Sequence, residues 1–168
     1  MSYQWEAFSS TYKVVPCTIK DMDILAPVCE GNPQYFAHMH APFHKESLME
    51  DLQAVPPGKS LAEKYFLRFM QKDSCVAFLD LIQDYPEPND AYIGWFMCAQ
   101  EYQHKGIGTA IIQELIAALK KQGVTRIALG YVQDNKQSEH FWQKQGFHAY
   151  GDVEQRDAYA IVRMQLLL

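Results

Sequence analysis

Long apolar runs are missing from this sequence of 168 residues. No uninterrupted apolar stretch approaches the roughly 18–20 residues that span a bilayer, so we expect no membrane partner. The opening segment, MSYQWEAFSS, has neither the basic region nor the apolar region of a secretory signal. These absences argue against export, and we expect a cytoplasmic protein.

Cysteine and basic charge are both scarce. Cys17, Cys29, Cys75 and Cys98 are widely spaced and form no C-x-x-C pair, so we expect free thiols that behave as small buried hydrophobes. The net charge of −5 argues against an extended nucleic-acid-binding surface. Repeats, low-complexity tracts and linker-like stretches are also missing. We therefore expect one domain over residues 1–168.

The patterns that are present indicate an α/β fold. Ile111, Leu115 and Leu119 recur at helical spacing before Gly123, and the segment at 126–132 is rich in β-branched and aromatic residues. A long helix between the strands at 91–98 and 126–132 requires parallel or splayed neighbours. We predict a mixed, mostly antiparallel sheet flanked by helices, with this pair splayed at its centre. Strands are expected at 12–19, 64–70, 74–82, 91–98, 126–132 and 157–166, and helices at 20–32, 34–40, 45–54, 109–123 and 135–146.

The loop QHKGIG, residues 103–108, lies between an apolar strand and the longest predicted helix. Amide groups at a helix N-terminus lack intrahelical partners and form a site for anions. Gly106 and Gly108 remove the Cβ atoms that would keep a phosphate from the backbone. The loop matches neither G-x-x-x-x-G-K-[ST] nor G-x-G-x-x-G. A plain strand-to-helix turn is the alternative.

Two motifs resemble the GNAT superfamily, the GCN-related N-acetyltransferases. QHKGIG matches the family's Q/R-x-x-G-x-G/A signature, and NKQSEHFWQKQGF, residues 135–147, resembles its N-x-x-A-x-x-x-[YW]-x-K-x-G-F element. The two motifs stand in the family's order, with the expected helix and strand between them. The resemblance covers residues 91–147 and implies binding of acetyl-CoA as a co-substrate.

The resemblance assigns roles to individual positions. It implies that the backbone of the strand at 91–98 holds the pantetheine arm, that the loop amides hold the pyrophosphate, and that the second motif faces the lower pantetheine arm. The strand positions are Phe96, Met97 and Cys98; the loop positions are Gln103, His104, Lys105, Gly106, Ile107, Gly108 and Thr109; the positions of the second motif are Asn135, Ser138, Phe141 and Trp142.

The catalytic acid and base are less clear from the motifs. Trp142 stands where many relatives carry a tyrosine that protonates the departing thiolate, and an indole N–H cannot act as that acid. An alkylamine, with a pKa of about 10.4, must lose a proton before it attacks. Asp80, a charge within an apolar strand, is a candidate base, and Tyr131 is a candidate donor. The alternatives are a solvated strand carboxylate for Asp80 and packing against a helix for Tyr131.

The segment HMHAPFH brings His38, His40 and His44 close together in the chain. The spacings of known zinc motifs are absent, so we expect no metal. The resemblance places this segment near the acceptor pocket, which makes a substrate contact the alternative to three surface histidines.

The function that we predict is transfer of an acetyl group from acetyl-CoA to a primary amine by direct attack in one ternary complex. A strand amide near Met97 or Cys98 would stabilise the developing oxyanion. A covalent route through the Cys98 thiolate, a non-catalytic acyl-CoA binding or sensing module, and a structural domain with a degenerate loop are the rivals. The acceptor, the use of longer acyl groups and the oligomeric state stay open, although a homodimer is common among relatives.

Overall fold

The computed structural model describes residues 2–168. The helices of this segment are α1 (Met22–Glu30), α2 (Pro33–Ala37), α3 (Lys45–Gln53), α4 (Ile107–Lys121) and α5 (Lys136–Lys144), and short 3₁₀ helices are η1 (Trp5–Phe8), η2 (Ile19–Asp21), η3 (Leu61–Glu63) and η4 (Gln100–Tyr102). The strands are β1 (Lys13–Pro16), β2 (Lys64–Gln71), β3 (Ser74–Gln83), β4 (Asp90–Cys98), β5 (Arg126–Val132), β6 (His148–Ala149), β7 (Glu154–Gln155) and β8 (Ala160–Leu167).

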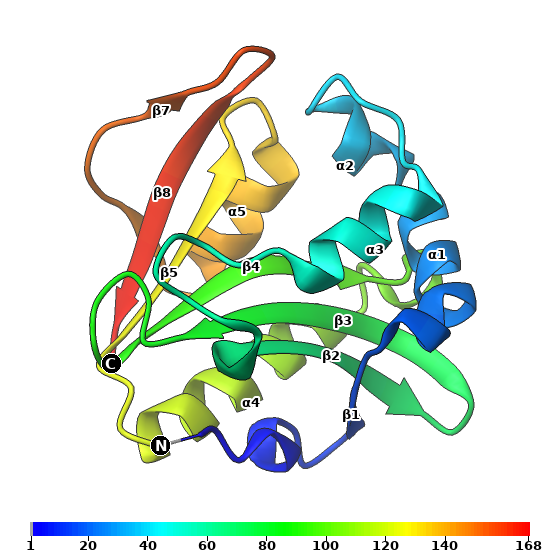
Figure 1. Ribbon diagram of the computed structural model, residues 1–168, viewed down its shortest axis with the longest axis horizontal. Coiled ribbons are helices and arrows are strands. Elements are labelled where there is room, and N and C mark those ends of the chain that lie inside the picture. Colours follow the sequence, from blue (N-terminus) through cyan, green and yellow to red (C-terminus); the bar gives the residue numbers. More distant parts are fainter. Residues whose placement is uncertain (1) are drawn as a thin grey trace.

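The strands form one mixed sheet in the order β1-β2-β3-β4-β5-β8-β6, with β7 paired to β8. Neighbours run antiparallel except for β4 and β5, which are parallel because α4 carries the chain across between them. In Figure 1, β2, β3 and β4 run together across the molecule, whereas β5 and β8 turn away from them at a steep angle. The predicted mixed sheet with a splayed central pair is confirmed.

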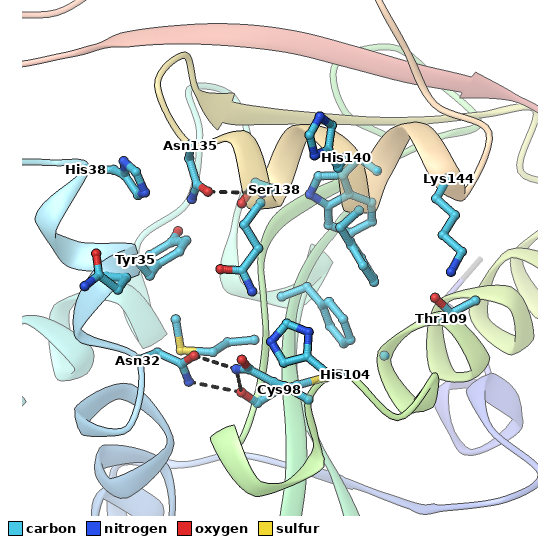
Figure 2. Close-up of a pocket in the computed structure, with 18 of the residues that line it drawn as sticks. Asn32, Tyr35, His38, Cys98, His104, Thr109, Asn135, Ser138, His140 and Lys144 are labelled. Carbon is cyan, nitrogen blue, oxygen red and sulfur yellow. Dashed lines mark hydrogen bonds between the residues drawn. The ribbon is translucent and has the colours of Figure 1, made fainter.

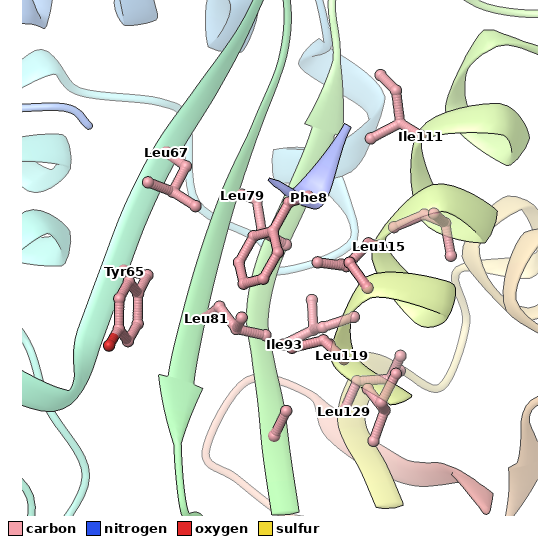
Figure 3. Close-up of a cluster of buried hydrophobic side chains, with 14 of the residues drawn as sticks. Phe8, Tyr65, Leu67, Leu79, Leu81, Ile93, Ile111, Leu115, Leu119 and Leu129 are labelled. Atoms are coloured by element: carbon pink, nitrogen blue, oxygen red, sulfur yellow. The ribbon is translucent and has the colours of Figure 1, made fainter. Parts of the chain in front are cut away.

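The larger part of the core lies between the sheet and α4. Ile111, Ile112, Leu115 and Leu119 on one face of α4 are fully buried against strand residues such as Leu79 and Ile127 (Figure 3). This is the apolar stripe that the spacing of four residues predicts. Gly123 follows the helix with a φ of 87°, in the left-handed region where glycine commonly ends helices.

A second core lies on the opposite face of the sheet, under α1, α2 and α3. Leu25, Phe36 and Leu48 from these helices pack on Phe78 of β3 and Met97 of β4. Helices therefore cover β2, β3 and β4 on both faces. The strand face of β5 and β8 beyond them is free to form a cavity wall.

The predicted elements differ from the observed ones mainly at their ends. The first strand stops at Pro16 instead of continuing to Ile19, because Thr18 and Asp21 form a capping box that begins η2. Met49 shares the helical spacing of Leu48 and Leu52, yet its side chain is 43% exposed. The two-residue strands β6 and β7 are too short to leave a periodic signal.

Replacement of Leu115 by alanine should destabilise the fold. The Leu115 side chain is completely buried, and removal of a buried leucine costs about 2–5 kcal/mol because a cavity remains. Urea unfolding of Leu115→Ala should show a loss of this size, whereas Met49→Ala at an exposed helix position should stay within about 0.5 kcal/mol of the parent. Equal losses in the two variants would contradict the assignment of α4 to the core.

Candidate active site

A bulge in β4 opens the centre of the sheet. Asp80 of β3 stands opposite Trp95, but its neighbour Leu81 stands opposite Ile93, so Gly94 is an extra residue in β4. Such a bulge bends the strand and increases its twist. The pairing of β4 with β5 ends at the same point, at Ile93 and Leu129, and the two strands then diverge (Figure 1).

The bulge leaves part of β4 facing the gap. Backbone groups of successive strand residues point to opposite edges, and the amide of Ala99 donates to Val76 of the chain segment at β3. The backbone of Met97 therefore faces β3, and that of Phe96 and Cys98 faces the gap. Two of the three predicted strand positions thus face the gap, but the Cys98 carbonyl already accepts from Asn32 and Gln103. The Phe96 backbone and the Cys98 amide remain as edge groups of the kind that bind an extended ligand.

The loop from Gln103 to Gly108 reaches the gap from β4. Gly106 is the N-cap of α4 and has a φ of 78°, a left-handed conformation that glycine adopts without strain. Gly108 is needed for a different reason, because a Cβ atom there would lie 3.1 Å from Sγ of Cys98 and 3.4 Å from the Phe141 ring. No side chain caps the first turn of α4 at Gly106, so its first amide groups lack that partner and are available to an anion.

These elements enclose a cavity of about 530 Å³, called here the larger cavity (Figure 2). Its walls come from the α1–α2 junction, the gap-facing end of β4, the glycine loop and the exposed side of α5. It is lined by Asn32, Gln34, Tyr35, His38, Phe96, Met97, Cys98, Gln103, His104, Gly106, Gly108, Thr109, Asn135, Gln137, Ser138, His140, Phe141, Trp142 and Lys144.

Most residues that the resemblance assigned to acetyl-CoA meet in the larger cavity. Lys105 and Ile107 point elsewhere. Nζ of Lys105 donates to the carbonyl of Glu101 at 2.7 Å, and the Ile107 side chain packs on the main core. Only the backbone amides of these two residues, at the start of α4, are therefore candidates for contact with a ligand. Lys144, on α5, adds a positive charge to the lining that had not been assigned a role.

Asn32 is a site residue that the motifs did not reveal. Its side-chain amide donates to the Cys98 carbonyl at 3.0 Å, and its Oδ1 accepts from Nε2 of Gln103 at 2.5 Å. Gln103 also donates to the Cys98 carbonyl at 2.9 Å. The signature glutamine therefore ties the glycine loop to β4 and to the α1–α2 junction. An isolated Asn-Pro pair in the sequence gives no sign of this long-range contact.

Polar side chains also hold α5 in place beside the loop. Oδ1 of Asn135 accepts from the amide of Ser138 at 3.0 Å and so caps α5 (Figure 2). Gln145, which is buried, donates from Nε2 to Oγ1 of Thr109 at 3.0 Å and accepts from Gln113. These bonds join the first turn of α4 to the end of α5, which fixes the width of the larger cavity.

A second cavity of about 380 Å³, called here the smaller cavity, opens on the other side of the gap. Its walls are β4, β5 and β8 with the turns at 85–86 and 150–159. Tyr35, Phe96, Asn135, Ser138 and Trp142 line both cavities. The two spaces therefore meet at the point where β4 and β5 diverge.

Asp80 lies just behind the wall of the smaller cavity. A Cβ atom on the lining residue Gly94 would be 2.9 Å from Oδ2 of Asp80, and the same oxygen accepts from Nζ of Lys64 at 2.8 Å. Oδ1 is buried and has no hydrogen-bond partner among residues 2–168. Burial raises the pKa of Asp80 to about 6, although Lys64 opposes this shift. The carboxylate is thus buried and paired, unlike the solvated carboxylate of the alternative interpretation.

Tyr131 and Trp142 are both largely buried. Tyr131 lines the smaller cavity and packs in the core, and its pKa is raised by burial and by Glu139 of α5. Trp142 packs edge-on against Phe141, with ring centroids 4.9 Å apart, and against Phe147 at 5.2 Å. The tryptophan therefore forms part of a packed aromatic wall.

The histidine segment is divided by the fold. His38 lines the larger cavity, whereas His40 and His44 are exposed at the surface. Within residues 2–168, no group of three His, Cys, Asp or Glu side chains is arranged to hold a metal ion. In the same segment, no helix combines the length and the apolar character that crossing a membrane requires.

Comparison with known proteins agrees with this geometry. The profile of the "Acetyltransferase (GNAT) family" matches residues 32–147. No curated protein matches the chain. A solved acetyltransferase from Thermus thermophilus is similar, with a TM-score of 0.75 and 24% identity over 93% of this chain and 96% of that one.

Other solved structures share the fold at lower identity. The PaiA N-acetyltransferase of Thermoplasma acidophilum, solved with coenzyme A, has a TM-score of 0.67 and 20% identity over 93% of this chain and 98% of that one. The ribosomal-protein-S18-alanine N-acetyltransferase of Escherichia coli has a TM-score of 0.64 and 16% identity, with 92% of each chain covered. At these identities the likeness shows the fold.

Proposed function

Because the chain belongs to the acetyltransferase (GNAT) family, we propose that it transfers the acetyl group of acetyl-CoA to a primary amine. The observation that carries this proposal is the meeting of two cavities at Tyr35, Phe96, Asn135, Ser138 and Trp142. A donor in one cavity and an acceptor in the other would touch only there. This arrangement favours direct attack in a ternary complex, because it holds both reactants in one orientation.

The larger cavity suits acetyl-CoA, which is an elongated molecule with negatively charged phosphates. The amides between His104 and Thr109 would hold the pyrophosphate at the start of α4, and Gly108 keeps the cradle open where a Cβ would fill it. The gap-facing backbone of Phe96 would pair with the pantetheine amides in the manner of an added strand. The coenzyme A bound in the Thermoplasma acidophilum relative supports this assignment.

The gap-facing amide of Cys98 is also the proposed donor to the thioester oxygen, where negative charge develops during attack. Asp80 would take the proton of the amine, directly or through water, and Tyr131 would return a proton to the departing thiolate. Burial and Glu139 raise the pKa of the Tyr131 phenol above its ordinary value of about 10, so the phenol carries its proton at neutral pH.

Replacement of Cys98 by alanine should cause at most a small change in kcat. Burial raises the pKa of the Cys98 thiol to about 12, so the thiolate that a covalent route needs is rare at neutral pH. The proposed roles of Cys98 belong to its backbone, which alanine keeps. Steady-state rates of thiol release measure the effect. Loss of turnover with full acetyl-CoA binding would instead favour an acetylated Cys98.

Calorimetric titration with acetyl-CoA, followed by thiol-release assays against an amine panel, tests the proposal. Binding together with acceleration by an amine supports the enzyme. Binding that no amine converts into thiol release favours the alternative of a non-catalytic acyl-CoA sensor. Failure to bind would reduce the glycine loop to a structural turn and overturn the proposal.

A further inference from the structure

The smaller cavity carries positive charge in a protein whose net charge is −5. Two arginines, Arg156 and Arg163, and one carboxylate, Glu154, are among its lining residues. Glu154 and Arg156 form an ion pair, with Oε1 and Nη2 3.1 Å apart, so these two charges largely offset each other. Arg163 supplies the charge that remains.

Arg163 is unusual among the arginines of this chain. Arg68 pairs with Asp21, Arg126 with Asp90 and Arg156 with Glu154. Among residues 2–168, Arg163 alone of the four arginines has no carboxylate within ion-pair distance. A guanidinium has five donors in a planar fork that matches a carboxylate, so this side chain is equipped to bind one.

The surroundings of Arg163 hold its guanidinium in place without using most of its donors. The group lies over the ring of Tyr150 at 5.4 Å, and Nη2 donates weakly to the carbonyl of Asp152 at 3.4 Å. A Cβ atom on Gly151 would lie 2.7 Å from Nη2, so the guanidinium rests directly on the backbone of that glycine. Stacking and close backbone contact restrict the motion of the Arg163 side chain before a ligand binds, so less side-chain entropy is lost on binding.

The strand register places Arg163 in the row that follows the last β4–β5 pair. Ile93 and Leu129 form the last β4–β5 pair, and the next row contains Gly94, Gly130 and then Arg163 of β8. Neighbouring strands are about 4.8 Å apart, so the backbone of Arg163 is at least about 10 Å from Gly94. The Arg163 guanidinium contacts Tyr150 and Gly151, which follow β6 on the side of β8 away from β5, so it marks the end of the smaller cavity opposite Gly94.

Aromatic rings form the walls between these two ends. Tyr85 and Tyr92 contact each other edge-on at 5.4 Å, and Trp95 stacks on Tyr35 at 5.9 Å. All four line the smaller cavity, whose volume of about 380 Å³ suits a small molecule. Aromatic walls can pack against the carbon skeleton of such a molecule. Recognition of its charged group is then left to Arg163 at one end of the cavity.

We propose that the acceptor is a small amine that also carries a carboxylate, an amino-acid-like molecule whose carboxylate is bound by Arg163 while its amine faces the bulge at Gly94. This inference rests on the proposed acetyl transfer and names the class of acceptor for that site. It favours free amino acids and related acids over simple alkylamines and over the side chains of folded proteins.

The test compares amino acids with the amines that result when the carboxylate is removed. The pairs are L-phenylalanine and phenethylamine, L-tyrosine and tyramine, and L-lysine and cadaverine, each assayed for kcat/KM by thiol release. The ratio within a pair is then compared between the parent and Arg163→Gln. Differences in amine basicity cancel in this comparison, because they are the same for both proteins. Lys136→Gln, at an exposed residue outside both cavities, controls for loss of a charge.

In the parent, at least one amino acid should exceed its decarboxylated partner, and Arg163→Gln should reduce that preference about tenfold to a hundredfold, as expected for a charge-assisted bond. The Lys136→Gln variant should keep the preference. An unchanged ratio in Arg163→Gln, or a panel in which no amino acid is acetylated better than its partner, overturns the proposal. Calorimetric titration with coenzyme A reports separately on the proposed function, since its failure would appear there first.

Discussion

Substitution of Gly108 by leucine is expected to weaken coenzyme A binding about a hundredfold while leaving the fold intact. A Cβ atom at this position already lies 3.1 Å from Sγ of Cys98 and 3.4 Å from the Phe141 ring, on the side that faces the larger cavity. The larger side chain must therefore enter the larger cavity between β4 and α5, beside the loop proposed for the pyrophosphate. We expect the dissociation constant for coenzyme A to rise at least about a hundredfold, the upper range for overpacking a tight site.

Ala110→Leu is a matched control, because Ala110 is exposed on the same first turns of α4. Calorimetry should show parental affinity for this variant, and thermal unfolding should show that both variants are folded. If folded Gly108→Leu binds coenzyme A as the parent does, the anion site is not at this helix start. Gly106 is less informative, because its replacement would strain a left-handed backbone as well as alter the site.

Local patterns were enough to predict the sheet and the loop. Three patterns each predict the structure of their own segment: the apolar stripe of α4, the glycine at each end of that helix, and the apolar run at 126–132. They do so because the physical constraint behind each pattern acts within a few residues. The splay of β4 from β5 followed from connection length. The bulge at Gly94 did not, because it depends on the register between β3 and β4.

The smaller cavity depends on contacts between distant segments. Arg163 comes from β8, Tyr150 from the segment after β6, Tyr85 from a loop and Tyr35 from α2, and they meet only in the folded chain. The same holds for Asn32, which bonds Gln103 although 71 positions separate the two residues in the sequence. Asp80 shows the limit most clearly. Its place in an apolar strand made it a candidate base in the sequence, but its burial and its ion pair with Lys64 are visible only in the structure.

Asp80→Asn is expected to lower kcat about a hundredfold or more, the usual contribution of a general base. The carboxylate pKa of about 6 means that Asp80 is ionised, and able to accept a proton, above that pH. The parent should therefore gain activity as the pH rises through about 6, and the variant should lose this rise. Affinity for coenzyme A should not change, since Asp80 lies behind the smaller cavity. Asp73→Asn, in the exposed turn between β2 and β3, should keep both activity and profile.

The same carboxylate should also be visible in stability, independently of turnover. Folding raises the pKa of Asp80 from an ordinary value of 3.8 to about 6, so the folded protein favours the neutral carboxyl more than the unfolded chain does. Its contribution to stability is therefore complete below about pH 4 and is lost as the pH rises through about 6. The asparagine side chain of Asp80→Asn is neutral throughout, so the variant should gain free energy of unfolding relative to the parent over this interval. If the stability difference follows this course while kcat and its pH profile stay parental, Asp80 is a buried partner of Lys64 and the base lies elsewhere.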